Sequence, residues 1–255
     1  DALPIYGETT VNYNRDVEIF PVLEAIFRQI SGESPYKSPT DMGVNMAGFC
    51  ITDDAACREA SRQEIIRRWY AAACQVREGL SDGAEQRKIE LILNSMGAGT
   101  GDRPVVGEAL RRAEETDGPA VAIQLPDGRI VTGKTTSLLG AASACLMNAL
   151  KALAGIDKKL LLITPSMIEQ IQHLKVEHLG NHNPRMHTDE LLITLAICAV
   201  TNPIAGSAIE ELRSLRGCEA HSSVILSNTD IELFKKIGVN ITCEPRYQVK
   251  KFYHK

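Results

Sequence analysis

Apolar side chains recur at the spacing of an α-helix through the first 118 residues. In the longest of these runs, Asp53 or Asp54 is placed to cap a helix whose apolar stripe contains Ile65, Ile66, Trp69, Ala73 and Val76. Proline and glycine bound the other runs, because proline fits the first turn of a helix and glycine the residue after its end. The pattern predicts an all-α N-terminal subdomain with helices at residues 12–30, 53–79, 84–96 and 102–118.

The pattern changes at Pro119, where a hairpin precedes a long apolar helix. Residues 120–125 and 129–131 are rich in β-forming side chains, and Pro126-Asp127-Gly128 between them is a turn sequence in which glycine supplies positive φ. Residues 138–153 are apolar on nearly every side, which is typical of a helix buried against a sheet. We therefore predict a second subdomain of α/β class, covering residues 119–255.

The hairpin also carries the sequence GRIVTGKT at residues 128–135, which matches the phosphate-loop pattern G-x-x-x-x-G-K-[ST]. Such a loop must curl so that its backbone amides surround a phosphate. The β-branched residues at 130–132 favour a second hairpin strand instead. We interpret the segment as a hairpin rather than a nucleotide site.

Later in the chain, helical runs at residues 165–175, 191–201, 203–215 and 230–237 alternate with short β-type runs at residues 159–164, 223–226 and 239–243. Proline begins the first and third of these helices, and Thr229 or Asp230 is placed to cap the last. The order β-β-α-β-α-α-α-β-α-β predicts a mixed sheet covered by helices, and it is similar to the cytidine-deaminase-like fold. Zinc deaminases of that fold use His or Cys ligands at the first helix and after the third strand. Here those places hold Gly140-Ala141-Ala142-Ser143 and Pro165-Ser166-Met167, and serine does not replace a zinc-binding thiolate. The fold is thus predicted without zinc ligands and without deaminase activity.

Two long polar segments, residues 31–49 and 173–190, are the main candidates for a binding site. Long loops without periodicity are uncommon in compact domains unless they are disordered or functional. Basic, hydroxyl and amide groups suit the recognition of anions, so we predict ligand-binding roles for Lys37, Thr40, Asn45, Arg185 and His187. Asp41 and Asp189 are the candidate proton acceptors. The alternative is that each segment is a well-packed connection.

The second polar segment also contains four of the six histidines. His178 and His182 have the spacing of the H-E-x-x-H metalloprotease helix, but Leu179 replaces the catalytic glutamate and Gly180-Asn181 interrupts the helix. A metal site built from His178, His182 and His187, with Asp189 or Glu190 as a carboxylate ligand, is therefore only an alternative. Ordinary hydrogen-bonded histidines in a polar loop are the simpler interpretation.

Charge and cysteine usage narrow the cellular setting. The net charge of −4 argues against nucleic acid as the main partner. No apolar run approaches the roughly 20 residues of a transmembrane helix, and we recognise no signal peptide. Seven scattered cysteines are typical of a reducing cytoplasm. We predict a cytoplasmic protein without a nucleic-acid or membrane partner, and the missing initiator Met suggests a fragment or processed chain.

Several longer segments resemble one family. YGETTVNYNRD at 6–16, SPYKSPTDMGVNMAGF at 34–49, PDGRIVTGKT at 126–135 and CEPRYQVKKFYHK at 243–255 are similar to uncharacterised bacterial protein family 0371, also called domain of unknown function 1846. The resemblance covers essentially the whole chain. It implies the C-terminal half of a larger cytoplasmic protein whose preceding half resembles a nucleotide-binding α/β domain. It supplies no catalytic residues to transfer, and the peptidase label of some members has no support in these residues.

These observations lead to three functional hypotheses. The leading one is a site for a small phosphorylated or nucleotide-like ligand between segments 31–49 and 173–190. The second is a structural or assembly module that completes a site held by the N-terminal half of the same protein. The third is a metal-dependent enzyme with His and carboxylate ligands. The sequence specifies neither a cofactor nor a reaction, and a homo-oligomer is compatible with it.

Overall fold

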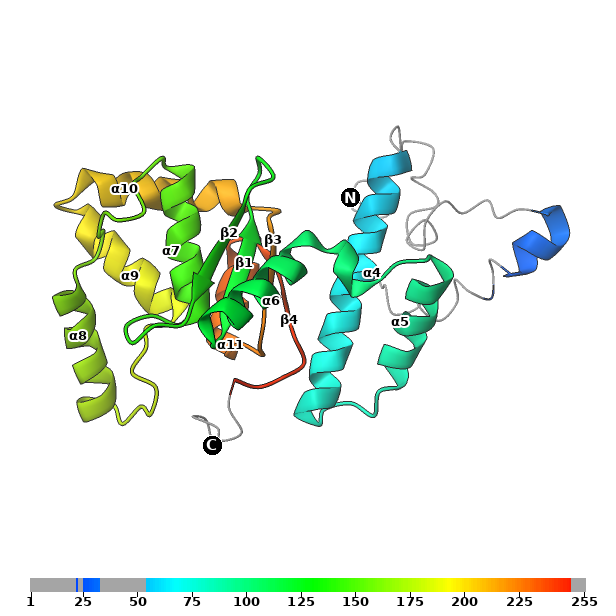
Figure 1. Ribbon diagram of the computed structural model, residues 1–255, viewed down its shortest axis with the longest axis horizontal. Helices are drawn as coiled ribbons and strands as arrows, with labels where there is room; N and C mark the ends of the chain where they lie inside the picture. Colours follow the sequence, from blue (N-terminus) through cyan, green and yellow to red (C-terminus); the bar gives the residue numbers. More distant parts are fainter. Residues whose placement is uncertain (1–21, 23–24, 33–53, 249–255) are drawn as a thin grey trace, which may run out of the picture. The chain divides into compact units, whose positions relative to one another are not determined.

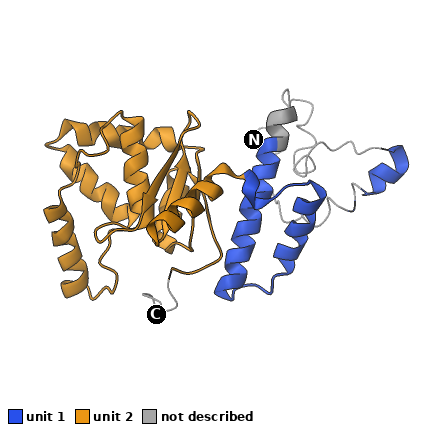
Figure 2. Cartoon of the chain, in the orientation of Figure 1, with its two compact units in different colours: residues 1–102 blue, residues 103–255 orange. Residues whose placement is uncertain are grey.

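The computed structural model describes residue 22 and residues 25–32 and 54–248 of the 255-residue chain. It divides into two compact units, residues 1–102 and 103–255 (Figure 2). The sequence pattern places the boundary at residue 118 because it groups α6 (Pro104–Thr116) with the preceding helices. In the structure α6 packs on the sheet of the second unit.

The first unit is helical where the structure describes it. Residues 25–31 form a helix, and α4 (Asp54–Glu78) packs against α5 (Ala84–Ser95), which is followed by the short 3-10 helix η2 (Thr100–Asp102). Apolar side chains spaced along α4 and α5 are buried, namely Ile65, Ile66, Tyr70, Ala73, Ile89, Ile92 and Leu93. The helices predicted at 53–79 and 84–96 are therefore confirmed.

A four-stranded mixed sheet lies at the centre of the second unit (Figure 1). Its order is β2-β1-β3-β4, formed by β1 (Ala120–Gln124), β2 (Ile130–Lys134), β3 (Glu219–Ser222) and β4 (Asn240–Cys243). Strand β1 pairs antiparallel with β2 and β3, whereas β3 and β4 are parallel. The predicted hairpin is confirmed, since Gly128 has a φ of 84° and its N–H donates to the Leu125 carbonyl at 2.9 Å.

Helices cover both faces of this sheet. The chain contributes α6, α7 (Ala141–Leu153), α8 (Pro165–His173), α9 (Thr188–Ala199), α10 (Pro203–Glu210) and α11 (Asn228–Lys236). Side chains alternate across β1, so Ala122 packs with α6 while Val121 and Ile123 join the larger core under α7. Neither unit, as far as it is described, contains a helix long and apolar enough to cross a membrane.

Gly133 shows why the phosphate-loop interpretation does not hold. The glycine lies within β2 and pairs with Val121 of β1, so the segment is extended rather than curled. A Cβ atom at this position would lie 2.1 Å from the backbone nitrogen of Cys145 and 2.4 Å from its Cα. Glycine is needed here because α7 packs directly on the β2 backbone. The motif is thus part of a hairpin that supports a helix, as the sequence pattern favours.

A buried arginine stabilises the β3–β4 edge of the sheet. Arg103, at the start of α6, is fully buried and donates to the carbonyls of Ala220 at 2.9 Å and Asn240 at 2.6 Å. Its guanidinium also forms an ion pair with Glu219 of β3. These contacts satisfy polar groups that would otherwise be costly to bury. They explain how the polar sequence EAHS forms an inner strand, where the pattern predicts β-structure only from residue 223.

The prediction of a strand at residues 159–164 is wrong. The segment is irregular; Leu162 and Ile163 are buried, but Leu160 and Leu161 are exposed. Lys151 of α7 holds the preceding turn by donating to the Lys158 carbonyl at 2.8 Å. The apolar run therefore anchors the chain beside α7 without joining the sheet, and the place next to β1 is taken by β3. The mixed α/β class is confirmed, whereas a cytidine-deaminase-like fold is not shown.

Candidate functional site

The polar segment at residues 173–190 is held against the start of α7. It leaves α8 through a π-helical turn, Leu174–His178, and enters α9 at Thr188. Met186 is fully buried and fixes the segment, because its N–H donates to the Leu138 carbonyl at 3.0 Å and its own carbonyl accepts from Ser143 Oγ at 2.8 Å. Arg185 and His187 flank Met186 on the side of the segment away from the core.

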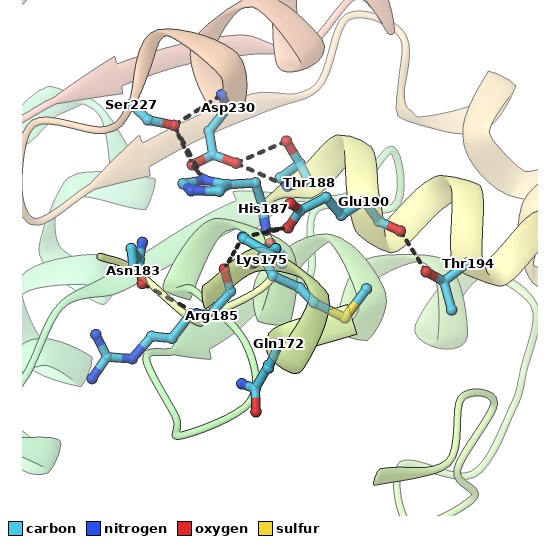
Figure 3. A network of polar contacts seen from close by, with 12 residues as sticks. Gln172, Lys175, Asn183, Arg185, His187, Thr188, Glu190, Thr194, Ser227 and Asp230 are labelled. Carbon is cyan, nitrogen blue, oxygen red and sulfur yellow. Dashed lines mark hydrogen bonds and ion pairs between the residues drawn. The ribbon is translucent and has the colours of Figure 1, made fainter. Parts of the chain in front are cut away.

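Asp230, in the first turn of α11, joins this segment to a distant part of the chain (Figure 3). Its Oδ1 accepts hydrogen bonds from the Thr188 backbone N–H and the Thr188 hydroxyl, both at 2.9 Å. Its Oδ2 accepts from Ser227 Oγ at 2.7 Å and lies 3.1 Å from His187 Nδ1. One carboxylate therefore ties the start of α9 to the start of α11.

This geometry fixes the orientation of the His187 ring. With Nδ1 directed at Asp230, the other ring nitrogen, Nε2, has no partner among the described residues, and the side chain is 22% exposed. The hydrogen bond to Asp230 raises the pKa of His187 above its ordinary value of 6.5, although partial burial opposes the shift. A histidine held in this way can accept or donate a proton at Nε2.

The pKa of Asp230 shifts in the opposite direction. Burial alone would raise it, but the hydrogen bonds from His187, Thr188 and Ser227 outweigh burial and hold the pKa below its ordinary value of 3.8. Asp230 is therefore a carboxylate at neutral pH. Its charge favours the protonated form of His187, and it supports the imidazole as a positioning group.

Lys175 and Glu190 form a second buried contact beside His187. Lys175 Nζ lies 2.7 Å from Glu190 Oε2 and donates to the Arg185 carbonyl at 2.7 Å, while its side chain is almost fully buried. Glu190 Oε2 also accepts the His187 backbone N–H at 2.8 Å, as the third residue of a helix does in a capping box. Lys175 and Glu190 are thus engaged in shaping the segment, which makes Glu190 unsuited to the metal-ligand role considered from the sequence.

Arg185 is anchored by one nitrogen and open at the others. Its Nε donates to the Thr136 carbonyl at 2.8 Å, and its backbone N–H donates to Asn183 Oδ1 at 3.2 Å. The two terminal guanidinium nitrogens have no partner within the described part of the chain. Figure 3 shows the guanidinium turned away from Asp230. The arginine is therefore held in place yet able to bind an anion.

The other predicted site residues fall into three groups. Lys37, Thr40, Asp41 and Asn45 lie outside the described residues. Asp189 is half-buried in the first turn of α9, and its Oδ1 is buried without a hydrogen-bond partner in the residues that the structure describes. His178 and His182 are exposed. Within the described ranges no group of three or more potential metal ligands gathers, so the metal hypothesis gains no support there.

Sequence reasoning missed Asp230, Ser227 and Lys175. The run Ser-x-x-Asp at residues 227–230 is a helix-start signal, and the pattern indicates Thr229 or Asp230 as the cap. In the structure Ser227 is the cap and accepts the Asp230 backbone N–H at 3.2 Å. Nothing in the sequence pairs Asp230 with His187, because the two residues are 43 positions apart.

A second histidine, His221, has a structural environment instead. It is fully buried in β3, with Nδ1 2.8 Å from Thr242 Oγ1 and Nε2 3.2 Å from Glu244 Oε1. Burial lowers the pKa of His221 below its ordinary value, although Glu244 opposes the shift. Both ring nitrogens are engaged, so His187 is the better candidate for chemistry.

The His187–Asp230 pair predicts a pH-dependent stability. The raised pKa of His187 means that its contribution is fully present below pH 6.5 and is lost as the pH rises through the folded-state pKa. The lowered pKa of Asp230 means that its contribution is present above pH 3.8 and is lost as the pH falls through the folded-state pKa. His187→Asn should therefore lower the free energy of unfolding most between pH 3.8 and pH 6.5, where both contributions are present. Urea unfolding of the wild-type chain and of His187→Asn across the pH range measures this difference. A difference that grows above neutral pH would contradict the predicted interaction between His187 and Asp230.

Comparison with known proteins identifies close relatives. The model of the C-terminal domain of unknown function DUF1846 matches residues 101–253, and that of the N-terminal DUF1846 domain matches residues 2–97. A UPF0371 protein of Streptococcus thermophilus (strain ATCC BAA-491 / LMD-9) is 53% identical over 253 residues, and one of Streptococcus pneumoniae (strain JJA) is 52% identical over 253 residues. Each alignment covers 99% of this chain and 51% of the relative. The chain thus spans about half the length of these curated relatives.

Proposed function

The chain belongs to the UPF0371 family, defined by the DUF1846 domains and of unknown function, and we propose that it binds a small phosphorylated or nucleotide-like ligand at the segment before α9. In this proposal Arg185 binds an anionic group and His187 carries a proton to or from the ligand through Nε2. We further propose Lys37, Thr40 and Asn45, which lie outside the described residues, as ligand-binding groups, with Asp41 or Asp189 as proton acceptor. We place this function in the cytoplasm of a bacterial cell.

The observation that carries the proposal is the orientation of His187. Its Nδ1 is fixed by a buried carboxylate, while Nε2 has no partner in the described residues and the ring is partly exposed. A protonated imidazole beside an arginine is suited to an anion, because charge-assisted hydrogen bonds are the stronger ones. The same imidazole can exchange a proton near neutral pH.

A thermal-shift panel tests this function. Inorganic phosphate, AMP and glucose 6-phosphate are added separately to the chain, because the ligand class, not the ligand, is proposed. A probe present at 100 times its dissociation constant should stabilise the folded chain by about 2.7 kcal/mol. We expect the shift to be lost in Arg185→Ala and in Lys37→Ala. Arg129→Ala is the matched control, because the Arg129 side chain is exposed on the hairpin and pairs with Asp127 of the turn.

The thermal shifts of the three variants show which of the two polar segments contributes to binding. A shift that disappears in both Arg185→Ala and Lys37→Ala supports a site shared by the two segments. If Arg185→Ala abolishes the shift and Lys37→Ala does not, the ligand binds at the α9 segment alone. An unchanged shift in Arg185→Ala, or equal losses in Arg129→Ala, would overturn the site proposed here.

The assembly module is the second candidate. In this candidate function the chain completes a site held by the N-terminal half of the same protein, and the length of the relatives favours it, because this chain spans about half of each.

A further inference from the structure

Helix α9 presents an apolar face to its surroundings. Ile193 is 62% exposed, Ile197 61% and Val200 83%, and their spacing of four and three residues places them along one side of the helix. We call these three side chains the α9 face. The opposite side of α9 carries Leu191, Leu195 and Cys198, which belong to the main core. The helix is therefore held by its inner side, while its outer side, equally apolar, is exposed among the described residues of the second unit.

The absence of charge extends well beyond this face. Between Leu191 and Ile209 the sequence contains no charged residue, although 24% of the chain is charged. This stretch covers nearly all of α9 and α10, which pack against each other (Figure 1). A helix that faces water normally has charged or polar residues on its outer side. An uncharged outer face on two neighbouring helices is typical of a surface that another protein covers.

The charge pattern indicates which partner fits. A surface that pairs with its own copy must be complementary to itself, and a charged residue on the two-fold axis would meet the same charge on the other copy. It is best formed from uncharged residues, as the α9 face is. Acidic residues lie only outside the stretch, with Asp189 and Glu190 before it and Glu210 and Glu211 after it. A partner of different sequence would allow complementary charges across the contact, and the stretch has none to offer.

We propose that the α9 face binds the α9 face of a second copy of this chain, with the two helices antiparallel. The antiparallel direction follows from the acidic residues at the start of α9. In a parallel pair the two Asp189 residues would approach each other, whereas in an antiparallel pair each approaches the uncharged turn at Thr201-Asn202 of the other copy. Ile197 is the middle residue of the face. It therefore lies next to the two-fold axis and meets Ile197 of the second copy.

Sedimentation equilibrium of the whole chain tests the dimer. The wild-type chain should have a mass near twice 27.9 kDa at high concentration and dissociate on dilution. Ile197→Glu should weaken the dimer by roughly 30-fold or more, as expected for a central contact residue. Leu91→Glu is the matched control, because Leu91 is 69% exposed but lies on α5 in the first unit. Circular dichroism confirms that both variants are folded, and Val200→Glu replaces Ile197→Glu if that variant is not.

A mixing experiment separates self-association from any other use of the face. Ile197→Glu and Ile197→Lys should each be monomeric, because like charges meet at the axis, and an equimolar mixture should form a heterodimer. A wild-type chain that is monomeric at every concentration would overturn the proposal and leave the face to the remaining half of the full-length protein. Dimers that persist in Ile197→Glu, or a mixture that stays monomeric, would overturn it as well.

Discussion

Replacing Gly133 with alanine should destabilise the second unit more than the same replacement at any other glycine described there. The new Cβ would lie 2.1 Å from the backbone nitrogen of Cys145, 2.4 Å from its Cα and 2.6 Å from the Ala144 carbonyl carbon. Backbone atoms cannot rotate aside as a side chain can, so α7 would have to move away from β2. Because α7 carries Leu146 and Leu150 into the main core, that movement would open the core. We expect a loss of about 3 kcal/mol or more in the free energy of unfolding.

Gly107→Ala is the control for this prediction. Gly107 lies within α6, has no positive φ, and a Cβ there would have no atom within 4 Å. Alanine in the middle of a helix is favoured over glycine by roughly 0.5–1 kcal/mol, so this variant should be slightly stabilised. Chemical unfolding monitored by circular dichroism gives both values. Equal, small effects of the two substitutions would show that α7 does not pack on β2 at Gly133.

Removing the Asp230 carboxylate should have the second largest effect. In Asp230→Ala the backbone N–H and hydroxyl of Thr188, the Ser227 hydroxyl and His187 Nδ1 all lose their acceptor at once. Thr188 is fully buried, so water cannot readily replace the lost hydrogen bonds. Each buried polar group left without a partner costs about 1–3 kcal/mol. We expect a total loss of about 3 kcal/mol, because His187 is partly exposed and can hydrogen-bond to water.

The same helix provides the control for Asp230. Glu232 is two residues further along α11 and is exposed. Glu232→Ala should change the free energy of unfolding by no more than about 0.5 kcal/mol. The two variants thus separate the loss of the buried network from the loss of a negative charge on α11. A loss in Glu232→Ala as large as that in Asp230→Ala would mean that the network does not join α9 to α11.

The sequence predicted correctly those helices and turns that depend on residues close together in the chain. The Asp-Gly turn with glycine at positive φ gave the β1–β2 hairpin. The proline inside the start of α6, α8 and α10 and the helical spacing of apolar residues gave those helices to within a few residues. The π-helical turn after α8 was not foreseen, because its single widened turn leaves no distinct pattern in the sequence.

Strands that depend on distant contacts could not be predicted in the same way. The run KLLLIT at 159–164 has the composition of a buried strand, but only Leu162 and Ile163 are buried and no strand lies beside it. The run EAHS at 219–222 has the composition of a loop, and it becomes an inner strand because Arg103, 117 residues before Ala220, donates to its backbone. Tertiary hydrogen bonds and packing override local preference in both cases.

The candidate site likewise combines residues that the local sequence indicated with one that only a distant contact brings in. Polarity and length drew attention to the segment at 173–190, where hydrogen bonds orient the side chains of Arg185 and His187. Asp230 orients His187 but comes from α11, and the sequence has no feature that joins them. The roles of Lys37, Thr40, Asp41 and Asn45 stay predictions, since these residues lie outside the described ranges.

The most direct test of the proposed function is to observe the His187 ring itself by long-range nitrogen–proton NMR, with His187→Asn used to assign its signals. At a pH where the imidazole is neutral, we predict the tautomer with the proton on Nδ1, because that nitrogen faces Asp230. Adding a phosphorylated probe that binds should protonate Nε2 and raise the pKa of His187, and the change should be absent in Arg185→Ala. A ring that carries its proton on Nε2 and does not respond to any phosphorylated compound would contradict the account.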